Sequence, residues 1–215
     1  TSYNTILRHM RVLCNEAINL GMTNNPLQGI TVKRGNAVLH KPIGDVVSLL
    51  SSIEKYNPNL HLCCLLAYGC LLRPHREIRE LTWKEFDNNL NFISLGGERN
   101  KSGRNRVVPI PSYLKNYLVK GDSDLNIFTN TQRPPNPHYF STLWSRYKKK
   151  HPEVGQCITL YSFRHTGALS VYNKTKSIHV LKEVMGHASL EVSMIYLRGL
   201  TIESLTEDVM PSLNN

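Results

Sequence analysis

The chain has 215 residues, of which 40% are hydrophobic and 20% are charged, so it can bury a core and is not a disordered tail. Its mean hydropathy is −0.31, and no apolar run approaches the ~18 residues of a membrane span, which excludes a transmembrane helix. The formal net charge of +10 favours a polyanionic partner, most often nucleic acid.

The first predicted element is an amphipathic helix over residues 3–20. Apolar residues such as Ile6 and Met10 recur at helical spacing, and Gly21 suits the C-terminal end of the helix. A basic segment marked by glycine and proline follows, and it has the composition of a linker. Because one helix cannot bury its own apolar stripe, we expect residues 1–36 to be the last helix and linker of a domain whose earlier part is not in this chain.

From residue 42 onward the pattern changes to shorter elements that predict one mostly helical domain over residues 37–215. Helices are expected at residues 45–53, 60–72, 75–81, 112–119 (capped by Ser112), 138–149, 162–172, 177–185, 189–196 and 202–210. Strands are expected at residues 90–95, with Leu90 and Phe92 on one face, and at 106–110. The predicted fold class is mainly α with a small antiparallel β-sheet (α+β).

The five cysteines give no sign of a disulfide framework. Their number is odd, Cys63 and Cys64 are adjacent, and the surrounding sequence is apolar and helical in pattern. Free thiols are typical of a reducing compartment, so we expect a cytoplasmic protein. A zinc site made of Cys63, Cys64, Cys70 and His75 is disfavoured, because that spacing matches no common ligand pattern.

Four separated segments concentrate polar groups that packing alone does not require. The first places Arg73 between a buried apolar helix and a proline that begins the next helix. The second is the basic turn between the two strands, which holds Lys101. The third puts Arg164 and His165 side by side at the start of a helix. The fourth is a Met-Gly-His sequence ending at His187, with a tyrosine nine residues later.

Each of these segments also has an ordinary structural explanation. An arginine at a helix end can form a cap or an ion pair, and a lysine in a Gly/Ser turn is usually solvated. Adjacent Arg and His can form a buried hydrogen-bonded pair, and a tyrosine on an amphipathic helix is usually a packing residue. No single segment decides between these explanations, but the order and spacing of all four do.

The joint pattern resembles the tyrosine recombinase (phage integrase) family. That family's signature is an arginine in G-x-R-x-x-E, a hairpin lysine in K-T/S-x-x-x-R-x-V-P-L, then H-x-x-R-H-T and L-G-H, with a tyrosine nucleophile nine residues after the last histidine. Here NKSGRNRVVPIP matches the hairpin segment, YSFRHT the second arginine segment and MGHASLEVSMIY the last segment. The resemblance covers about residues 37–200, and residues 3–36 look like the end of the family's core-binding domain.

Two departures from the family pattern stand out. The family's first histidine falls at Tyr161, whose phenol can hydrogen-bond a phosphate oxygen but is a poor cation at neutral pH. The first arginine segment is one residue longer between arginine and glutamate than R-x-x-E. We choose Arg73 as the first arginine because it directly precedes the proline-started helix, with Arg76 as its rival. Glu77 is then interpreted as a structural partner that orients an arginine.

The resemblance implies that a tyrosine oxygen attacks a DNA phosphodiester and forms a 3′-phosphotyrosyl enzyme. Two guanidinium groups would hold the phosphate oxygens in the transition state, the last histidine would add a donor, and the hairpin lysine would protonate the leaving 5′-oxygen. The predicted catalytic set is Arg73, Lys101, Tyr161, Arg164, His165, His187 and Tyr196, with His165 mainly in a supporting role. Since the covalent intermediate stores the bond energy, no ATP is expected. No metal or cofactor is expected either, and the absence of a carboxylate cluster from the sequence fits this.

The leading hypothesis is a site-specific DNA recombinase or integrase, prokaryotic or encoded by a mobile element and associated with the nucleoid. Its expected partner is double-stranded DNA, on which it would act as a homotetramer, with no membrane partner. The predicted phosphate contacts are Arg76, Arg104, Arg106, Arg133, Arg146 and Lys148. A C-terminal helix within residues 199–215 would dock on a neighbouring protomer or fold back on its own core. The alternatives are a type IB topoisomerase-like or telomere-resolvase enzyme that nicks and reseals DNA, and a catalytically impaired DNA-binding module.

Overall fold

The structure is a computed structural model, and it describes residues 2–33, 40–99, 103 and 105–197. Lys101, Arg104 and the helix predicted at residues 202–210 lie outside the described residues. The chain divides into two compact units, Thr1–Leu39 and His40–Asn215, which we call the N-terminal unit and the main unit.

The N-terminal unit contains one long helix, α1 (Tyr3–Asn19), close to the predicted bounds. Ser2 caps it by accepting a hydrogen bond from the backbone N–H of Thr5, at 3.3 Å. The side chain of Asn4 bonds both backbone groups of Lys33, so the segment after the helix returns along it. Within the unit, Leu7 is buried while Leu13 is 69% exposed, so most of the apolar stripe is uncovered.

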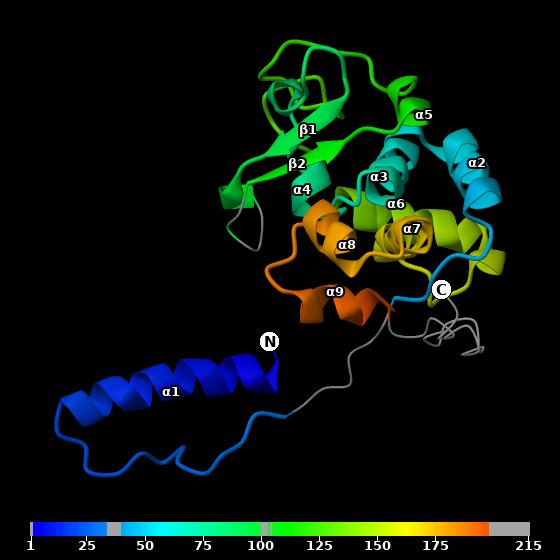
Figure 1. Cartoon of the computed structure of the whole chain (residues 1–215). Helices are drawn as coiled ribbons and strands as arrows, with labels where there is room; N and C mark the ends of the chain where they lie inside the picture. Colours follow the sequence, from blue (N-terminus) through cyan, green and yellow to red (C-terminus); the bar gives the residue numbers. More distant parts are fainter. Residues whose placement is uncertain (1, 34–39, 100–102, 104, 198–215) are drawn as a thin grey trace, which may run out of the picture. The chain divides into compact units, whose positions relative to one another are not determined.

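The main unit is mostly helical, and its described residues hold one two-stranded antiparallel sheet (Figure 1), as the sequence predicts. Its helices are α2 (Val46–Tyr56), α3 (Pro58–Gly69), α4 (Arg76–Arg79), α5 (Ser112–Lys115), α6 (Tyr139–Lys150), α7 (Leu160–Thr175), α8 (Ile178–Met185) and α9 (Leu190–Leu197). Its strands are β1 (Phe92–Leu95) and β2 (Arg106–Pro109), and short 3₁₀ turns occur at η1 (Trp83–Glu85), η2 (Gly97–Arg99) and η3 (Pro152–Val154).

Helices α3 and α7 form the centre of the main unit, because α3 is apolar on nearly all sides and α7 packs directly against it. Their backbones meet at Gly167, where an added Cβ would lie 2.1 Å from the carbonyl oxygen of Tyr68. No other residue fits there without moving a helix. Helices α8 and α9 then pack on α7 and on each other (Figure 1), which brings the C-terminal part of the described chain back to the centre.

Helix α3 ends three residues before its predicted end. Cys70, Leu71 and Leu72 continue the apolar pattern and are fully buried, which explains the prediction of a helix to residue 72. The backbone nevertheless leaves the helix, because Leu71 adopts a left-handed conformation with φ of 50°. The carbonyl of Leu71 therefore points away from α3, where it becomes an acceptor for other side chains.

Two more predicted helices are shorter than expected. Helix α4 is a single turn. At α5, Ser112 is the first helical residue rather than the cap, and the backbone N–H groups of Tyr117 and Leu118 bond three residues back, so the chain continues in tight turns beyond Lys115. The sequence predicts a helix to residue 119 because Leu114 and Leu118 are apolar at helical spacing. The tight turns bury both of these side chains as well.

The hairpin pairs Ile93 with Val108 and Leu95 with Arg106. Ile93 and Leu95 face the core, whereas Phe92 is 47% exposed, so the face of the strand that holds Phe92 is its outer face. The same alternation turns the first residue of β2, Arg106, inward together with Val108. An arginine is thereby placed on the core side of the sheet.

Candidate active site

The site is organised around Glu77, whose side chain is only 1% exposed. The backbone N–H of Arg73 donates to Glu77 Oε2 at 2.8 Å, and the Arg73 guanidinium pairs with Oε1 of the same carboxylate. The backbone N–H of Ile78 bonds the carbonyl of Arg73, so residues 73–78 close a single turn. The segment that is one residue longer than the family pattern therefore still returns the glutamate to the arginine.

Two further arginines reach the same place from different elements. Arg106 of β2 donates from Nη1 to the carbonyl of Met185 at 2.7 Å and from Nη2 to the carbonyl of Leu71 at 3.4 Å. Arg164 of α7 donates to the same two carbonyls, at 3.1 Å for Met185. Both guanidinium groups also lie near Glu77 Oε2, at 3.6 Å and 3.8 Å. One carboxylate and two carbonyls thus join the hairpin, α7, the end of α3 and the end of α8.

The site holds more positive than negative charge. Burial opposes ionisation of Glu77, but Arg106, Arg73 and Arg164 outweigh it and lower the pKa of this carboxyl. Burial lowers the pKa of Arg106 to about 10; Glu77 opposes that shift, while Arg164 and Arg73 add to it. Three guanidinium groups around one carboxylate leave an excess of positive charge, which suits an anionic ligand such as a phosphate.

The predicted phosphate contact at Arg106 does not agree with this geometry. Its side chain is 3% exposed, and both of its terminal nitrogens already bond carbonyl oxygens. Gly186, which ends α8 with a left-handed φ of 65°, lies directly over it: a Cβ there would be 2.6 Å from Arg106 Cδ. Arg106 is therefore a buried link between β2 and α8. The signal in the sequence was its position two residues before Val108, on the apolar face of the strand.

Tyr196 lies beside two histidines and the buried Arg164. Its ring centroid is 5.6 Å from that of His165 and 5.2 Å from that of His187. Burial lowers the pKa of Arg164, and the adjacent Tyr196 hydroxyl is the largest effect that opposes this shift. The tyrosine is positioned by α9, which packs on α7 and α8. The structure thus brings the predicted nucleophile to the predicted second arginine within one chain.

His187 is neutral in this environment. Burial, together with the positive charges of Arg164, Arg73 and Arg106, lowers its pKa to about 4. Its Nδ1 lies 2.9 Å from the hydroxyl oxygen of Ser193, which is itself fully buried. If Ser193 donates to Nδ1, the proton of the neutral ring is on Nε2, where it can be donated to a ligand.

Tyr161 stands at the edge of the same cluster. Burial raises its pKa, while Arg73 and Arg164 act in the opposite direction, so the phenol lies within reach of both positive charges. Two imidazoles flank it: His40 is stacked on the phenol with centroids 5.0 Å apart, and His75 lies 5.6 Å away at an angle of 53°. Neither histidine belongs to the predicted catalytic set, and no spacing in the sequence indicates that they meet.

The remaining predicted contacts lie apart from the cluster or are engaged elsewhere. Arg76 is 65% exposed and pairs with Glu80 at 3.4 Å, unlike its rival Arg73. The ammonium of Lys148 donates to the backbone carbonyls of Gln156 and Ile158, each at 3.3 Å. Arg133 and Arg146 are exposed.

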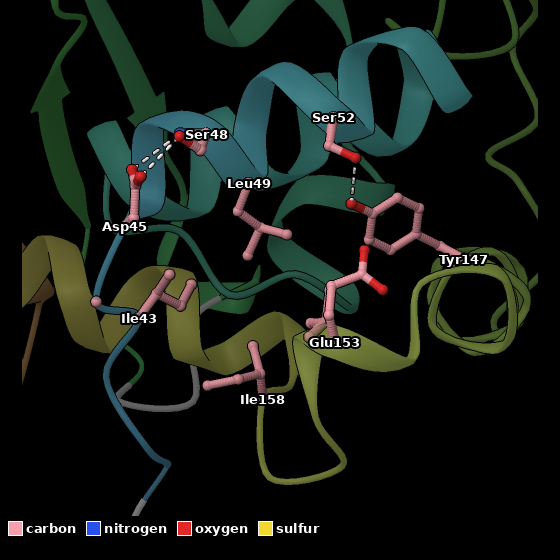
Figure 2. Close-up of a pocket in the computed structure, with 10 residues that line it drawn as sticks. Ile43, Asp45, Ser48, Leu49, Ser52, Tyr147, Glu153 and Ile158 are labelled. Atoms are coloured by element: carbon pink, nitrogen blue, oxygen red, sulfur yellow. Dashed lines mark hydrogen bonds between the residues drawn. The ribbon is translucent and has the colours of Figure 1, made fainter.

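A cavity of about 410 Å³ between α2 and the end of α6 is separate from this cluster. Figure 2 shows its polar groups: Asp45 caps α2 through Ser48, and the Tyr147 hydroxyl bonds Ser52 at 2.8 Å. These polar groups therefore hydrogen-bond to one another. In the described part of the chain, no three His, Cys, Asp or Glu side chains are grouped so that they could hold a metal ion. No described helix has the length and apolar character needed to cross a membrane.

Fold and site together define a helical domain in which several arginines and a tyrosine from distant segments are clustered. The phage integrase family model matches residues 44–201, and the chain belongs to this family. It is 30% identical over 171 residues to the tyrosine recombinase XerA of Pyrococcus furiosus, covering 77% of this chain and 58% of that protein. It is 27% identical to a tyrosine recombinase of Thermosipho africanus over 46% of this chain and 36% of that protein. The chain thus spans little more than half the length of XerA.

Solved structures show the same fold. A lambda integrase dimer bound to a COC′ core site superposes with a TM-score of 0.75 at 18% identity, covering 95% of this chain and 61% of that one. XerH site-specific recombinase bound to difH substrate, in a post-cleavage complex, superposes with a TM-score of 0.60 at 20% identity, covering 78% and 52%. At these identities the similarity establishes the fold.

Proposed function

We propose that this chain cleaves and rejoins DNA strands in site-specific recombination, through a 3′-phosphotyrosyl intermediate formed at Tyr196. The observation that carries the proposal is the position of the Tyr196 phenol, beside His165 and His187 and next to the guanidinium of Arg164. A nucleophilic oxygen and a surplus of guanidinium charge in one pocket are what phosphoryl transfer needs, because negative charge builds up on the phosphate oxygens in the transition state.

The other groups take roles that follow from their contacts. Arg73 and Arg164 bind the non-bridging phosphate oxygens, and Arg73 is the more accessible of the two, with 22% of its side chain exposed. His187, neutral at pH 7, donates from Nε2. Tyr161 donates from its hydroxyl, because its raised pKa keeps it protonated. Lys101, which falls between β1 and β2 in the sequence, protonates the leaving 5′-oxygen.

The reaction needs no external energy source in this proposal. The Tyr196 oxygen forms a bond to phosphorus as the bond to the 5′-oxygen breaks, and the leaving oxygen takes a proton. A 5′-hydroxyl then attacks the phosphotyrosine and releases the tyrosine, so the number of phosphodiester bonds is unchanged. Neither ATP nor a metal ion enters this balance.

The partner in this proposal is double-stranded DNA, on which four copies of the chain assemble to exchange strands. The formal charge of +10 supports a polyanionic partner. The proteins in the lambda integrase and XerH structures are bound to DNA, which supports the same choice.

The test is a covalent trapping experiment in which the protein itself selects its target sequence. The purified chain is incubated with duplexes that carry a randomised window and a nick, so that the cleaved fragment diffuses away and the adduct accumulates. Adducts that survive denaturation are isolated and their DNA is sequenced. We expect an enriched sequence, with a phosphate attached to Tyr196 in peptide mass spectra.

Two variants frame the result. Tyr196→Phe should give no adduct, whereas Tyr113→Phe, which removes the hydroxyl of a 45% exposed tyrosine on α5, should behave as the unmodified chain. Absence of any adduct, or an adduct that persists in Tyr196→Phe, would overturn the proposal. Cleavage and resealing of the enriched duplex without strand exchange between two duplexes would replace recombination by a nicking-resealing activity.

A further inference from the structure

The two departures from the family pattern meet in the fold. One is the phenol at position 161 in place of histidine, and the other is the extra residue in the segment from Arg73 to Glu77. His75 lies within that longer segment, and its ring centroid is 5.6 Å from that of Tyr161. A chain that lacks an imidazole at position 161 thus has one beside it, supplied by a different segment.

Tyr161 borders the place where the scissile phosphate would bind. It lies on the first turn of α7, three residues before Arg164, and the charges of Arg73, Arg164, Tyr196 and Glu77 all act on the pKa of its hydroxyl. A group in ring contact with Tyr161 can therefore approach the same phosphate. His75 satisfies this condition, because it is exposed and follows Arg73 by two residues.

His75 is also available to bind a ligand. The described residues provide no hydrogen-bond partner for its ring. Burial and the nearby His138 lower the pKa of His75, so at pH 7 the ring is mainly neutral and carries one N–H. His40, on another side of the phenol, differs: its ring is stacked at 13° and its Nδ1 lies 3.2 Å from the Thr159 hydroxyl. His40 presents a ring face to Tyr161, whereas the ring of His75 is tilted by 53° to the phenol.

We propose that His75 donates a hydrogen bond to the scissile phosphate and so supplies the imidazole that the family pattern places at position 161. This inference rests on the proposed function, because it assigns a catalytic residue to the same pocket. It also explains how Tyr161 is tolerated: the phenol provides one hydrogen bond, and the relocated imidazole provides the other.

The experiment is a double-mutant cycle on the duplex selected by covalent trapping. Rates of adduct formation are measured for the unmodified chain, His75→Ala, Tyr161→His and the double variant. We expect His75→Ala to slow adduct formation on the order of 10²-fold, as for the loss of one transition-state donor. In the Tyr161→His background the same change should cost less than about threefold, because an imidazole again occupies position 161.

Controls separate this role from folding and from general DNA binding. His179→Ala removes another exposed histidine, on α8, and should match the unmodified chain. His75→Gln keeps an N–H donor and should fall between the unmodified chain and His75→Ala. DNA affinity of each variant, measured with Tyr196→Phe added, should stay within about threefold, since one neutral donor contributes little to binding dominated by phosphate charge.

The outcomes are distinct. If the unmodified chain gives no adduct, the proposed function fails. If it gives an adduct and His75→Ala reacts at the rate of His179→Ala, only the role of His75 is overturned. An equal loss from His75→Ala in the Tyr161 and Tyr161→His backgrounds would also overturn it, because a purely structural defect does not depend on the residue at position 161.

Discussion

The candidate site has an inner part and a rim, and the two hold their polar groups in different ways. The inner part, Glu77, Arg106 and Arg164, is buried, and its charges bond carbonyls and a carboxylate from four segments of the chain. The rim, Arg73, His75 and Tyr161, is partly exposed. The two parts therefore have different roles. The inner part is already arranged before DNA binds, which reduces the reorganisation needed during the reaction. The rim keeps donors that a phosphate can use.

The largest expected effect is a loss of stability when Glu77, in the inner part, is replaced. Glu77→Gln removes the carboxylate near three guanidinium groups, two of which are buried. We expect the free energy of unfolding, measured by urea denaturation, to fall by about 3–5 kcal/mol, as when one partner of a buried ion pair is removed. Glu183→Gln, which removes a 77% exposed carboxylate paired with Lys182, should change it by less than about 0.5 kcal/mol. Similar losses in both variants would mean that the inner part is not the source of stability we infer.

The next largest effect is a loss of activity when Arg73, in the rim, is replaced. Arg73→Ala should slow adduct formation by about 10²–10³-fold while DNA affinity changes little, because its contact is strongest in the transition state. Arg76→Ala should stay within about threefold, since Arg76 points to Glu80 and is 65% exposed. Single-turnover rates on the trapped duplex test this pair. The opposite ranking would make Arg76 the first arginine.

A smaller effect tests whether Arg106 belongs to the inner part or contacts DNA. Arg106→Met removes one of the two arginine donors from the carbonyls of Leu71 and Met185. Because Arg164 bonds the same two carbonyls, its position should loosen, and adduct formation should fall about tenfold or more. The slope of log affinity against log salt concentration should not change, whereas loss of a phosphate contact would lower it by about one. Arg79→Met, which also removes a bond to a carbonyl, that of Pro135, is the matched control and should retain the rate.

The most gradual effect is on the pH dependence of stability, because it develops over more than two pH units. His187 has a pKa of about 4 in the folded chain, below its ordinary value of 6.5, so the unfolded chain binds more protons between these pH values. The free energy of unfolding should therefore fall as the pH drops from about 6.5 to about 4, by up to about 3 kcal/mol from this group. His187→Gln should flatten that slope in urea titrations. An unchanged slope would show that His187 does not carry it.

The sequence predicted most elements because their signals are local. The helix ending at Gly186 and the spacing from His187 to Tyr196 are local patterns of apolar residues and glycine, and the family model and the fold agree with the family assignment built on them. Helix α3 was over-extended because Leu71 and Leu72 look helical by hydrophobicity, although the backbone turns at Leu71.

The sequence could not predict contacts between distant segments. Arg106 was assigned to DNA because it lies in a run of basic residues, and only the strand alternation indicated the core. Tyr161 contacts His40 and His75, each of which lies more than eighty positions earlier in the chain, so no sequence periodicity could predict these contacts. The role of Glu77 as partner of an arginine was predicted, but its shared position among three was not, because that depends on where α7 and β2 pack.

The absence of a side chain at Gly167 lets α3 and α7 approach closely between the segments that carry Arg73 and Arg164. A Cβ there would lie 2.1 Å from the carbonyl oxygen of Tyr68, so any larger residue would push the two helices apart. Gly167 therefore helps to set the distance between the two arginines, although it contacts no substrate itself.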